Sequence, residues 1–292
     1  MSTSQSTPRH SSTAANTTGD GGTSPTTTTS STRLATTGPR SLLRDSWIVL
    51  SRELRPMLHD PFSVVFSLVQ PLFFLALFGP LLAGNLGPGL PGGDVWQWFV
   101  PSIVVMIALF GSTMVGSNLL YEMHTGAHER MLVTPLSRPS LLVGRALKEF
   151  VTLVVQAAII VLVMVPFGFR IYPLGVLLGL VLLGLLGVGI SSLSYALAIA
   201  VRKQEWMFWV VQQTFLFPLM ILSGMLLPLE GGPGWMRVLS QGNPLTYVVE
   251  ATRSLFAGEL WTGDVLWGFV AAGLTALVGV SVGIRAMRAS AG

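Results

Sequence analysis

The chain has 292 residues, of which 51% are hydrophobic and only 10% are charged, and its mean hydropathy is +0.65. A soluble domain carries about 25% charged residues, so this composition excludes an ordinary soluble protein. The net charge is +4, but the basic residues stand at the ends of apolar segments, as membrane insertion favours. The absence of cysteine excludes disulfides, haem attachment and thiolate metal sites. We therefore expect an all-α membrane protein that binds no nucleic acid.

The beginning of the chain differs from the rest. Residues 1–40 contain 21 serines or threonines and no apolar run, which predicts a disordered cytoplasmic tail. Residues 41–59 then place apolar side chains at helical spacing opposite charged ones. This pattern fits a helix lying in the membrane interface, and it also fits a short solvated helix ahead of the first span.

Six apolar segments are long enough to cross a bilayer, whose hydrocarbon core requires about 20 helical residues. They cover about residues 62–83, 98–120, 150–169, 173–201, 206–227 and 265–284. Lysines and arginines number six before the first segment, four after the second, two after the fourth and two after the sixth, against three on the opposite side. This distribution predicts six spans with both termini in the cytoplasm.

Small residues four positions apart mark faces on which helices can approach each other closely. Such faces occur in the fourth and sixth segments, where they pack either within the chain or against a second copy, and we expect packing within the chain. The residues are Gly175 with Gly179, Gly187 with Ser191, Gly268 with Ala272 and Ala276, and Thr275 with Gly279 and Gly283.

The residues required for chemistry are missing from the spans. No charged residue lies in the central half of any expected span, where an ionisable group would indicate ion or proton handling. Neither lysine stands in a phosphate-binding loop, and His124 and His128 have no third metal ligand near them in the sequence. We expect no catalytic residue, no metal and no bound cofactor, and therefore an energy source outside this chain.

Residues 121–148 form a charged segment between the second and third spans. A short helix beginning at Thr125 or Gly126 would place Glu129 near its positive end, and Pro135 would terminate it. A second helix starting at Ser137 would run into the third span. The short helix fits a groove on a soluble partner, and equally it fits a connector resting on the lipid headgroups.

Residues 241–260, with the sequence QGNPLTYVVEATRSLFAGEL, are organised as well. Asn243 can cap a helix, Pro244 suits its first position, and Gly258 suits the left-handed residue beyond its end. Glu250 and Arg253, three residues apart, can pair. This helix is too short and polar to span a bilayer, so it forms either an outer lid or re-entrant hairpin, or a solvated outer helix.

These two segments carry a family resemblance. The sequence EMHTGAHERMLVTPLSRPSLLVGRALKE resembles the connection between the second and third spans of ABC-2 type exporter permeases. The sequence LSGMLLPLEGGPGWMRVLSQGNPLTYVVEATRSLFAGEL, here called the outer segment (residues 222–260), is similar to the connection between spans five and six in the daunorubicin-resistance-like branch. The similarity covers residues 41–288. It implies one transmembrane domain, residues 41–292, that dimerises and pairs with two separate ATP-binding subunits carrying Mg-ATP.

The resemblance also implies roles for individual residues. The short helix at 126–133 corresponds to the coupling helix that docks on the ATP-binding subunit. The family's charged pattern falls on Glu122, Gly126, Glu129 and Arg130, and Pro135 closes it; the outer motif falls on Asn243, Pro244, Tyr247, Glu250 and Arg253.

The spans offer amide and aromatic side chains, and no charge, to a transported compound. Gln70, Asn118, Gln212, Gln213 and Phe215 are our candidates for the lining of a substrate path between two copies. Such a lining suits an amphiphilic or hydrophobic compound. We expect the permease of an ATP-driven exporter that moves a drug-like or antibiotic-like compound out across the bacterial cytoplasmic membrane by alternating access. A lipid or polysaccharide exporter, a secondary drug antiporter and a non-transporting scaffold are the alternatives, and homodimer and heterodimer both stay open.

Overall fold

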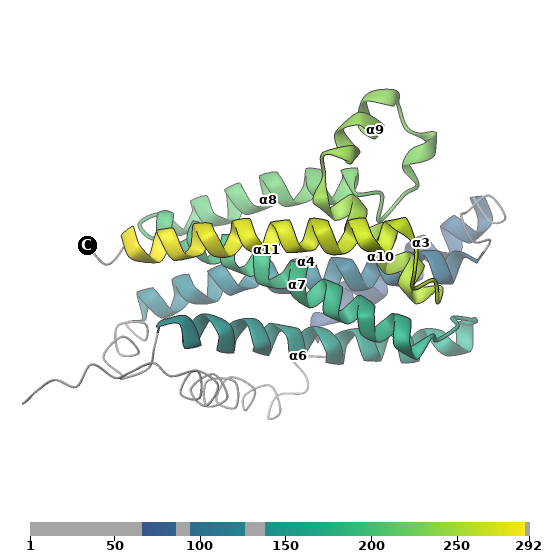
Figure 1. Cartoon of the computed structure of the whole chain (residues 1–292), viewed down its shortest axis with the longest axis horizontal. Helices are drawn as coiled ribbons and strands as arrows, with labels where there is room; N and C mark the ends of the chain where they lie inside the picture. Colours follow the sequence, from purple (N-terminus) through teal and green to yellow (C-terminus); the bar gives the residue numbers. More distant parts are fainter. Residues whose placement is uncertain (1–65, 86–93, 126–137, 290–292) are drawn as a thin grey trace, which may run out of the picture. The chain divides into compact units, whose positions relative to one another are not determined.

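The computed structural model describes residues 66–85, 94–125 and 138–289, and these residues contain helices and turns but no strand. The expected tail (1–40) and interfacial helix (41–59) lie outside the described residues. Figure 1 shows the described helices. They are α3 (Val69–Asn85), α4 (Val95–His124), α6 (Arg138–Met164), α7 (Pro173–Ala200), α8 (Glu205–Leu222), α9 (Gly234–Gln241), α10 (Pro244–Phe256) and α11 (Gly263–Ala289), with short 3₁₀ turns η2 (Val165–Phe167) and η3 (Leu229–Gly231).

Five of the described helices, α4, α6, α7, α8 and α11, are long and apolar enough to cross a membrane. The sixth apolar helix, α3, has 17 residues in its described part. These helices confirm an all-α membrane protein. The helix bounds differ in places from the apolar segments, most clearly in α8, which ends at Leu222 although the apolar segment runs to residue 227. Gly224 takes a positive φ of 69°, a left-handed conformation that cannot continue the helix.

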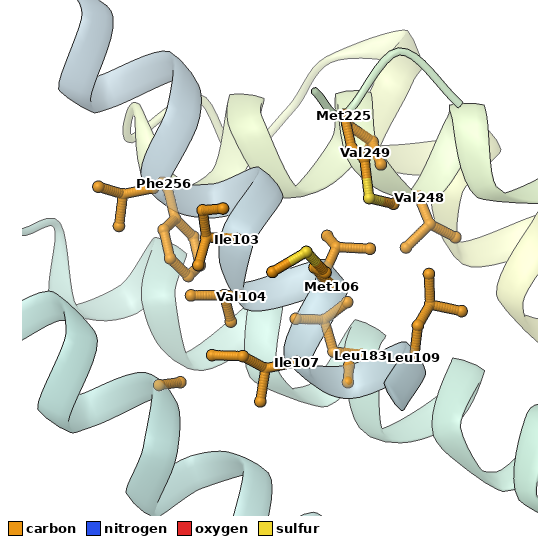
Figure 2. Packing of buried hydrophobic residues seen from close by; sticks show 14 of the residues in the cluster. Ile103, Val104, Met106, Ile107, Leu109, Leu183, Met225, Val248, Val249 and Phe256 are labelled. Atoms are coloured by element: carbon orange, nitrogen blue, oxygen red, sulfur yellow. The ribbon is translucent and has the colours of Figure 1, made fainter. Parts of the chain in front are cut away.

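Helix α4 is the most buried of the long helices. Of its most apolar 18-residue window, 83% is buried, against 22% for α8. Helix α4 contacts α3, α6, α7, α8 and α10, so most of its apolar surface packs against other helices of the chain. Figure 2 shows Ile103 of α4 beside Phe256 of α10, and Met106 and Leu109 of α4 near Leu183 of α7 and Val248 of α10.

The small residues of α7 and α11 let these two helices touch through their backbones. A Cβ added to Gly189 would lie 2.7 Å from the carbonyl carbon and oxygen of Thr275. A Cβ added to Gly279 would collide with the carbonyl oxygen of Gly189, and one on Gly283 would lie 3.3 Å from that of Ser192. These contacts confirm the predicted packing of small residues within the chain.

Candidate functional site

The structure describes one of the five expected coupling residues. Glu122 lies in the last turn of α4 and is partly buried, whereas Gly126, Glu129, Arg130 and Pro135 lie outside the described residues. Helix α4 ends at His124 and α6 begins at Arg138. A helix starting near Ser137 and running into the third span is therefore confirmed.

The end of α4 contacts the start of α8. His124 Nε2 lies 2.9 Å from Glu205 Oε1, and both side chains are about half exposed. Thr125 closes the helix by donating its hydroxyl to the carbonyl of Tyr121 at 2.9 Å. The energy of such an exposed pair is small because solvent screens it. The contact nevertheless places the end of α4 against the start of α8, an arrangement that sequence spacing gave no means of finding.

Helix α10 has the caps that the sequence predicts. The side chain of Asn243 accepts a hydrogen bond from the backbone N–H of Leu245 at 3.0 Å, and Pro244 occupies the first helical position. Gly258 has a φ of 87°, as expected for the residue beyond the helix end. Helix α10 packs against α4, α7 and α11. Its buried face excludes the solvated outer helix as an interpretation of residues 244–256.

Side chains of the outer segment also donate to carbonyl groups at the end of α8, where a helix leaves carbonyls short of backbone partners; the carbonyl of Leu219 accepts from the backbone N–H of Ser223 as well. Asn243 Nδ2 donates to the carbonyl of Leu219 at 2.7 Å, and Thr246 Oγ1 donates to that of Leu222 at 3.3 Å. Just beyond the helix, Arg253 Nη2 donates to the carbonyl of Gly224 at 2.9 Å. Side chains of α10 thus hold the end of α8 in place.

Arg253 connects this region to α4. Its Nε and Nη2 donate to Ser102 Oγ at 3.1 and 2.8 Å, and Nε also donates to the carbonyl of Trp98 at 3.2 Å. The guanidinium carbon lies 3.7 Å from the centroid of the Trp98 ring, a cation–π geometry. The predicted pairing of Arg253 with Glu250 stays a prediction; both side chains line the same cavity.

That cavity, here called the outer cavity, has a volume of about 860 Å³. Its walls come from the starts of α4 and α11, the turn between α6 and α7, the segment after α8, and the end of α10. The charged residues that line it are Asp94, Arg170, Glu250, Arg253, Glu259 and Asp264. Such walls suit water and charged or polar groups.

Gln97 joins three parts of the wall of the outer cavity. Its Nε2 donates to the carbonyls of Phe256 at 2.6 Å and Arg170 at 3.2 Å, and its Oε1 accepts from the N–H of Arg170 at 3.1 Å. The start of α4, the turn before α7 and the end of α10 are thereby held together. The sequence reading missed Gln97, because only the folded arrangement brings these segments into contact.

The five candidate path residues lie on three helices. Gln70 on α3 and Asn118 on α4 are exposed, as is Phe215 on α8, with an exposed fraction of 67%. None of the five lines the outer cavity. Gln212 is buried and Gln213 partly buried, and the side-chain oxygen of each is buried without a hydrogen-bond partner among the described residues. These two amides are therefore the most unusual of the five candidates.

One carboxylate lies closer to the middle of the bundle than the sequence indicated. Glu149 precedes the expected third span by one residue, but α6 begins eleven residues earlier, and Glu149 Oε2 lies 3.6 Å from the position of a Cβ on Gly111 of α4. Glu149 lines a cavity of about 20 Å³, enough for one water, together with Ser112, Thr152 and Gln156. Glu149 is the second residue of the candidate span Lys148–Phe167, so the expectation that no charged residue lies in the central half of a span is unaffected.

The fold thus defines a multi-pass membrane protein with a long central helix and a packed, polar outer segment. The chain belongs to the ABC-2 type transporter family, which it matches over residues 44–257, and it is a permease subunit of that type. This confirms the family resemblance noted in the sequence.

Three similar proteins illustrate the relationship. The chain is 27% identical over 231 residues to the daunorubicin resistance ABC transporter permease protein DrrB1 of Streptomyces coeruleorubidus, a match covering 78% of this chain and 81% of the relative. It is 26% identical over 260 residues to the doxorubicin resistance ABC transporter permease protein DrrC of Mycobacterium tuberculosis, covering 86% and 91%. It is 30% identical over 227 residues to the transport permease ycf38 of Cyanophora paradoxa, covering 75% and 76%.

Proposed function

We propose that this chain is the membrane-spanning subunit of an ATP-driven exporter that moves an amphiphilic or hydrophobic compound out across the bacterial cytoplasmic membrane. The observation that carries this proposal is membership of the ABC-2 type transporter family over residues 44–257. Two of the named relatives are drug resistance permeases, which supports a drug-like or antibiotic-like cargo. A lipid or polysaccharide cargo is the alternative within the same mechanism.

The energy comes from ATP bound with Mg²⁺ on two separate subunits, which dock on the coupling helix at 126–133. The connectivity of the described helices supports this route. The coupling segment joins the end of α4 to the start of α6, so force on it acts on the central helix directly. The contact between His124 and Glu205 extends the same force to α8. Movement of these helices would produce alternating access.

The substrate path runs beside α8, between this chain and a second permease that is either identical or related. Two observations support this location. Leaving a buried polar atom without a hydrogen bond costs about 1–3 kcal/mol, so the amide oxygens of Gln212 and Gln213 favour a polar partner outside the described residues. Helix α8 also buries a small share of its surface within the chain, which leaves room for the second permease.

The distribution of basic residues supports a cytoplasmic location for both termini and for the turn after α7, which carries Arg202 and Lys203. The outer segment and the outer cavity then face the other side of the membrane. In this orientation the outer cavity receives the compound after it passes α8. Its water-accessible, charged walls suit release into an aqueous space better than tight retention of an apolar molecule.

Coexpression with the ATP-binding subunit of the same exporter tests the proposal. Glu129→Lys and Pro135→Ala should weaken capture of that subunit and abolish export, while the variant chains still insert in the membrane. Glu259→Lys, a charge reversal in the outer cavity, serves as the matched control and should leave capture unchanged. Unchanged export by the Glu129→Lys variant would contradict the assignment of the coupling helix.

The position of Glu149 favours testing one rival, a secondary antiporter with a membrane-embedded carboxylate. In proteoliposomes containing both subunits, we expect transport to require ATP and to proceed without a pH gradient. Transport driven by a pH gradient without ATP, and lost in Glu149→Gln, would assign the chain to the rival class.

A further inference from the structure

A groove of about 510 Å³ lies at the turn between α7 and α8. Its wall has two parts. Arg202, Lys203 and Gln204 form the polar part, on the turn itself. The apolar part is contributed by α7, α8 and α11, through Ala196, Ile199, Ala200, Val201, Met207 and Ala286.

The polar part of the groove carries positive charge without a matching negative one. Arg202 and Lys203 are exposed, and neither makes a hydrogen bond or ion pair within the described part of the chain. The nearest carboxylate in sequence, Glu205, is paired with His124 at 2.9 Å. Among the residues that the structure describes, no carboxylate lines the groove. Its chemistry therefore favours an anion.

The apolar part of the groove begins where the hydrocarbon region ends. Helix α7 is a continuous apolar helix up to Ala200, and the two basic residues follow within three positions. Trp206 stands at the start of α8 with 64% of its surface exposed, and exposed tryptophans are enriched at the level of the lipid headgroups. The groove thus offers positive charge at headgroup level and an apolar wall next to it.

We propose that this groove binds one anionic phospholipid. Its phosphate lies between Arg202 and Lys203, and an acyl chain runs along Ala200 and Met207. Basic pockets between membrane helices bind anionic headgroups in this way. A zwitterionic lipid carries a phosphate too, but its cationic group would find no carboxylate in the groove. An acidic segment of a soluble protein would satisfy the charges but would leave the apolar wall empty.

Native mass spectrometry of the purified full chain, with phosphatidylglycerol or phosphatidylcholine added, tests the proposal. The wild-type chain should retain one phosphatidylglycerol at least about tenfold more tightly than phosphatidylcholine, because two basic groups contribute. The double variant R202Q/K203Q should lose this preference, whereas R202K/K203R should keep it. Arg237→Gln, which removes one exposed arginine of α9 instead, controls for the loss of a basic residue elsewhere and should bind as wild type.

A second variant separates the lipid from other anions. Ala200→Trp fills the apolar part without changing charge, so it should weaken phosphatidylglycerol binding, and inorganic phosphate should not displace the lipid. Equal binding of the two lipids, retention of phosphatidylglycerol by R202Q/K203Q, or full displacement by inorganic phosphate would overturn the proposal. It would also be overturned if R202Q/K203Q bound lipid normally but lost the ATP-binding subunit, since the charges would then serve the protein partner. These readouts require no transport, so they stand apart from the exporter proposal.

Discussion

Arg253 is the residue on which the outer segment most depends. Its guanidinium donates to Ser102, to the carbonyl of Trp98 on α4 and to the carbonyl of Gly224 beyond α8, while its plane covers the ring of Trp98. A flat, forked group with several fixed donors makes these contacts together, and an ammonium group cannot. Position 253 therefore requires the planar shape and the several donors of a guanidinium group, and not only a positive charge.

We predict that Arg253→Lys destabilises the chain almost as much as Arg253→Gln. Hydrogen bonds to a charged group contribute about 1.5–3 kcal/mol each when lost from a partly buried position, so the melting temperature in detergent should fall by several degrees for both variants. Arg237→Gln is the control, because Arg237 is exposed. A lysine variant as stable as wild type would show that charge, rather than geometry, matters at this position.

Two glycines of α11 differ only in what surrounds them. A Cβ on Gly279 would collide with the carbonyl oxygen of Gly189, whereas a Cβ on Gly273 would have nothing within 4 Å. We predict that Gly279→Ala lowers stability, since α7 and α11 must separate. Gly273→Ala should be neutral or stabilising by up to about 1 kcal/mol through helix propensity. Melting of the two purified variants compares them directly, and equal melting temperatures would contradict the close contact between the helices.

At the scale of elements, the side chains of α10 and its cap support the end of α8. Asn243 has two functions that chemistry can separate: its oxygen caps α10 and its nitrogen donates to Leu219 of α8. Thr246 and Arg253 extend the same support to Leu222 and Gly224. We infer that the end of α8 and the outer segment move as one unit when α8 moves.

Asn243→Asp tests this unit, because aspartate keeps the cap of α10 and loses the donor to α8. We predict faster hydrogen exchange at the amides of Ser223 and Gly224, which bond back into α8, with the amides of α10 unchanged. Asn243→Ala should speed exchange in both helices. Ser117→Ala, whose hydroxyl donates to Met114 within α4, is the control. Unchanged exchange at Ser223 in Asn243→Asp would separate α8 from the outer segment.

The sequence predicted elements whose signals are local, and it missed contacts between distant segments. The caps of α10 follow from Asn243, Pro244 and Gly258 because each acts on its own neighbours. The bond from Gln97 to Phe256 joins residues 159 positions apart, and no periodicity encodes it. An apolar run shows which residues cross the hydrocarbon region. It does not show which residues of other helices a carboxylate at its end contacts, and Glu149 was therefore placed outside the third span.

At the scale of the whole molecule, α4 is held on nearly every side, whereas α8 buries only one narrow stripe along its length, formed by Phe208, Gln212, Leu216 and Met220. His124 contacts the start of α8, and α10 holds its end. The middle carries Gln212 and Gln213, whose oxygens lack partners among the described residues. The small buried share of α8 and its two unsatisfied amides support the proposal that this helix contacts the substrate or the second permease.

Replacing an unsatisfied amide should therefore affect stability and transport in opposite directions. We predict that Gln213→Met leaves the melting temperature unchanged or raises it, because an apolar group of similar size removes a buried oxygen without a hydrogen bond. Drug export with the ATP-binding subunit should fall at least about fivefold, because the substrate loses a polar contact.

Gln97→Met is the reciprocal control: it removes an amide with three hydrogen bonds, so its melting temperature should fall. Both quantities can be measured on the same purified preparations, by melting in detergent and, after reconstitution with the ATP-binding subunit, by ATP-dependent transport in proteoliposomes. A fall in stability for Gln213→Met, with export reduced in proportion, would make this amide a structural residue and remove it from the substrate path.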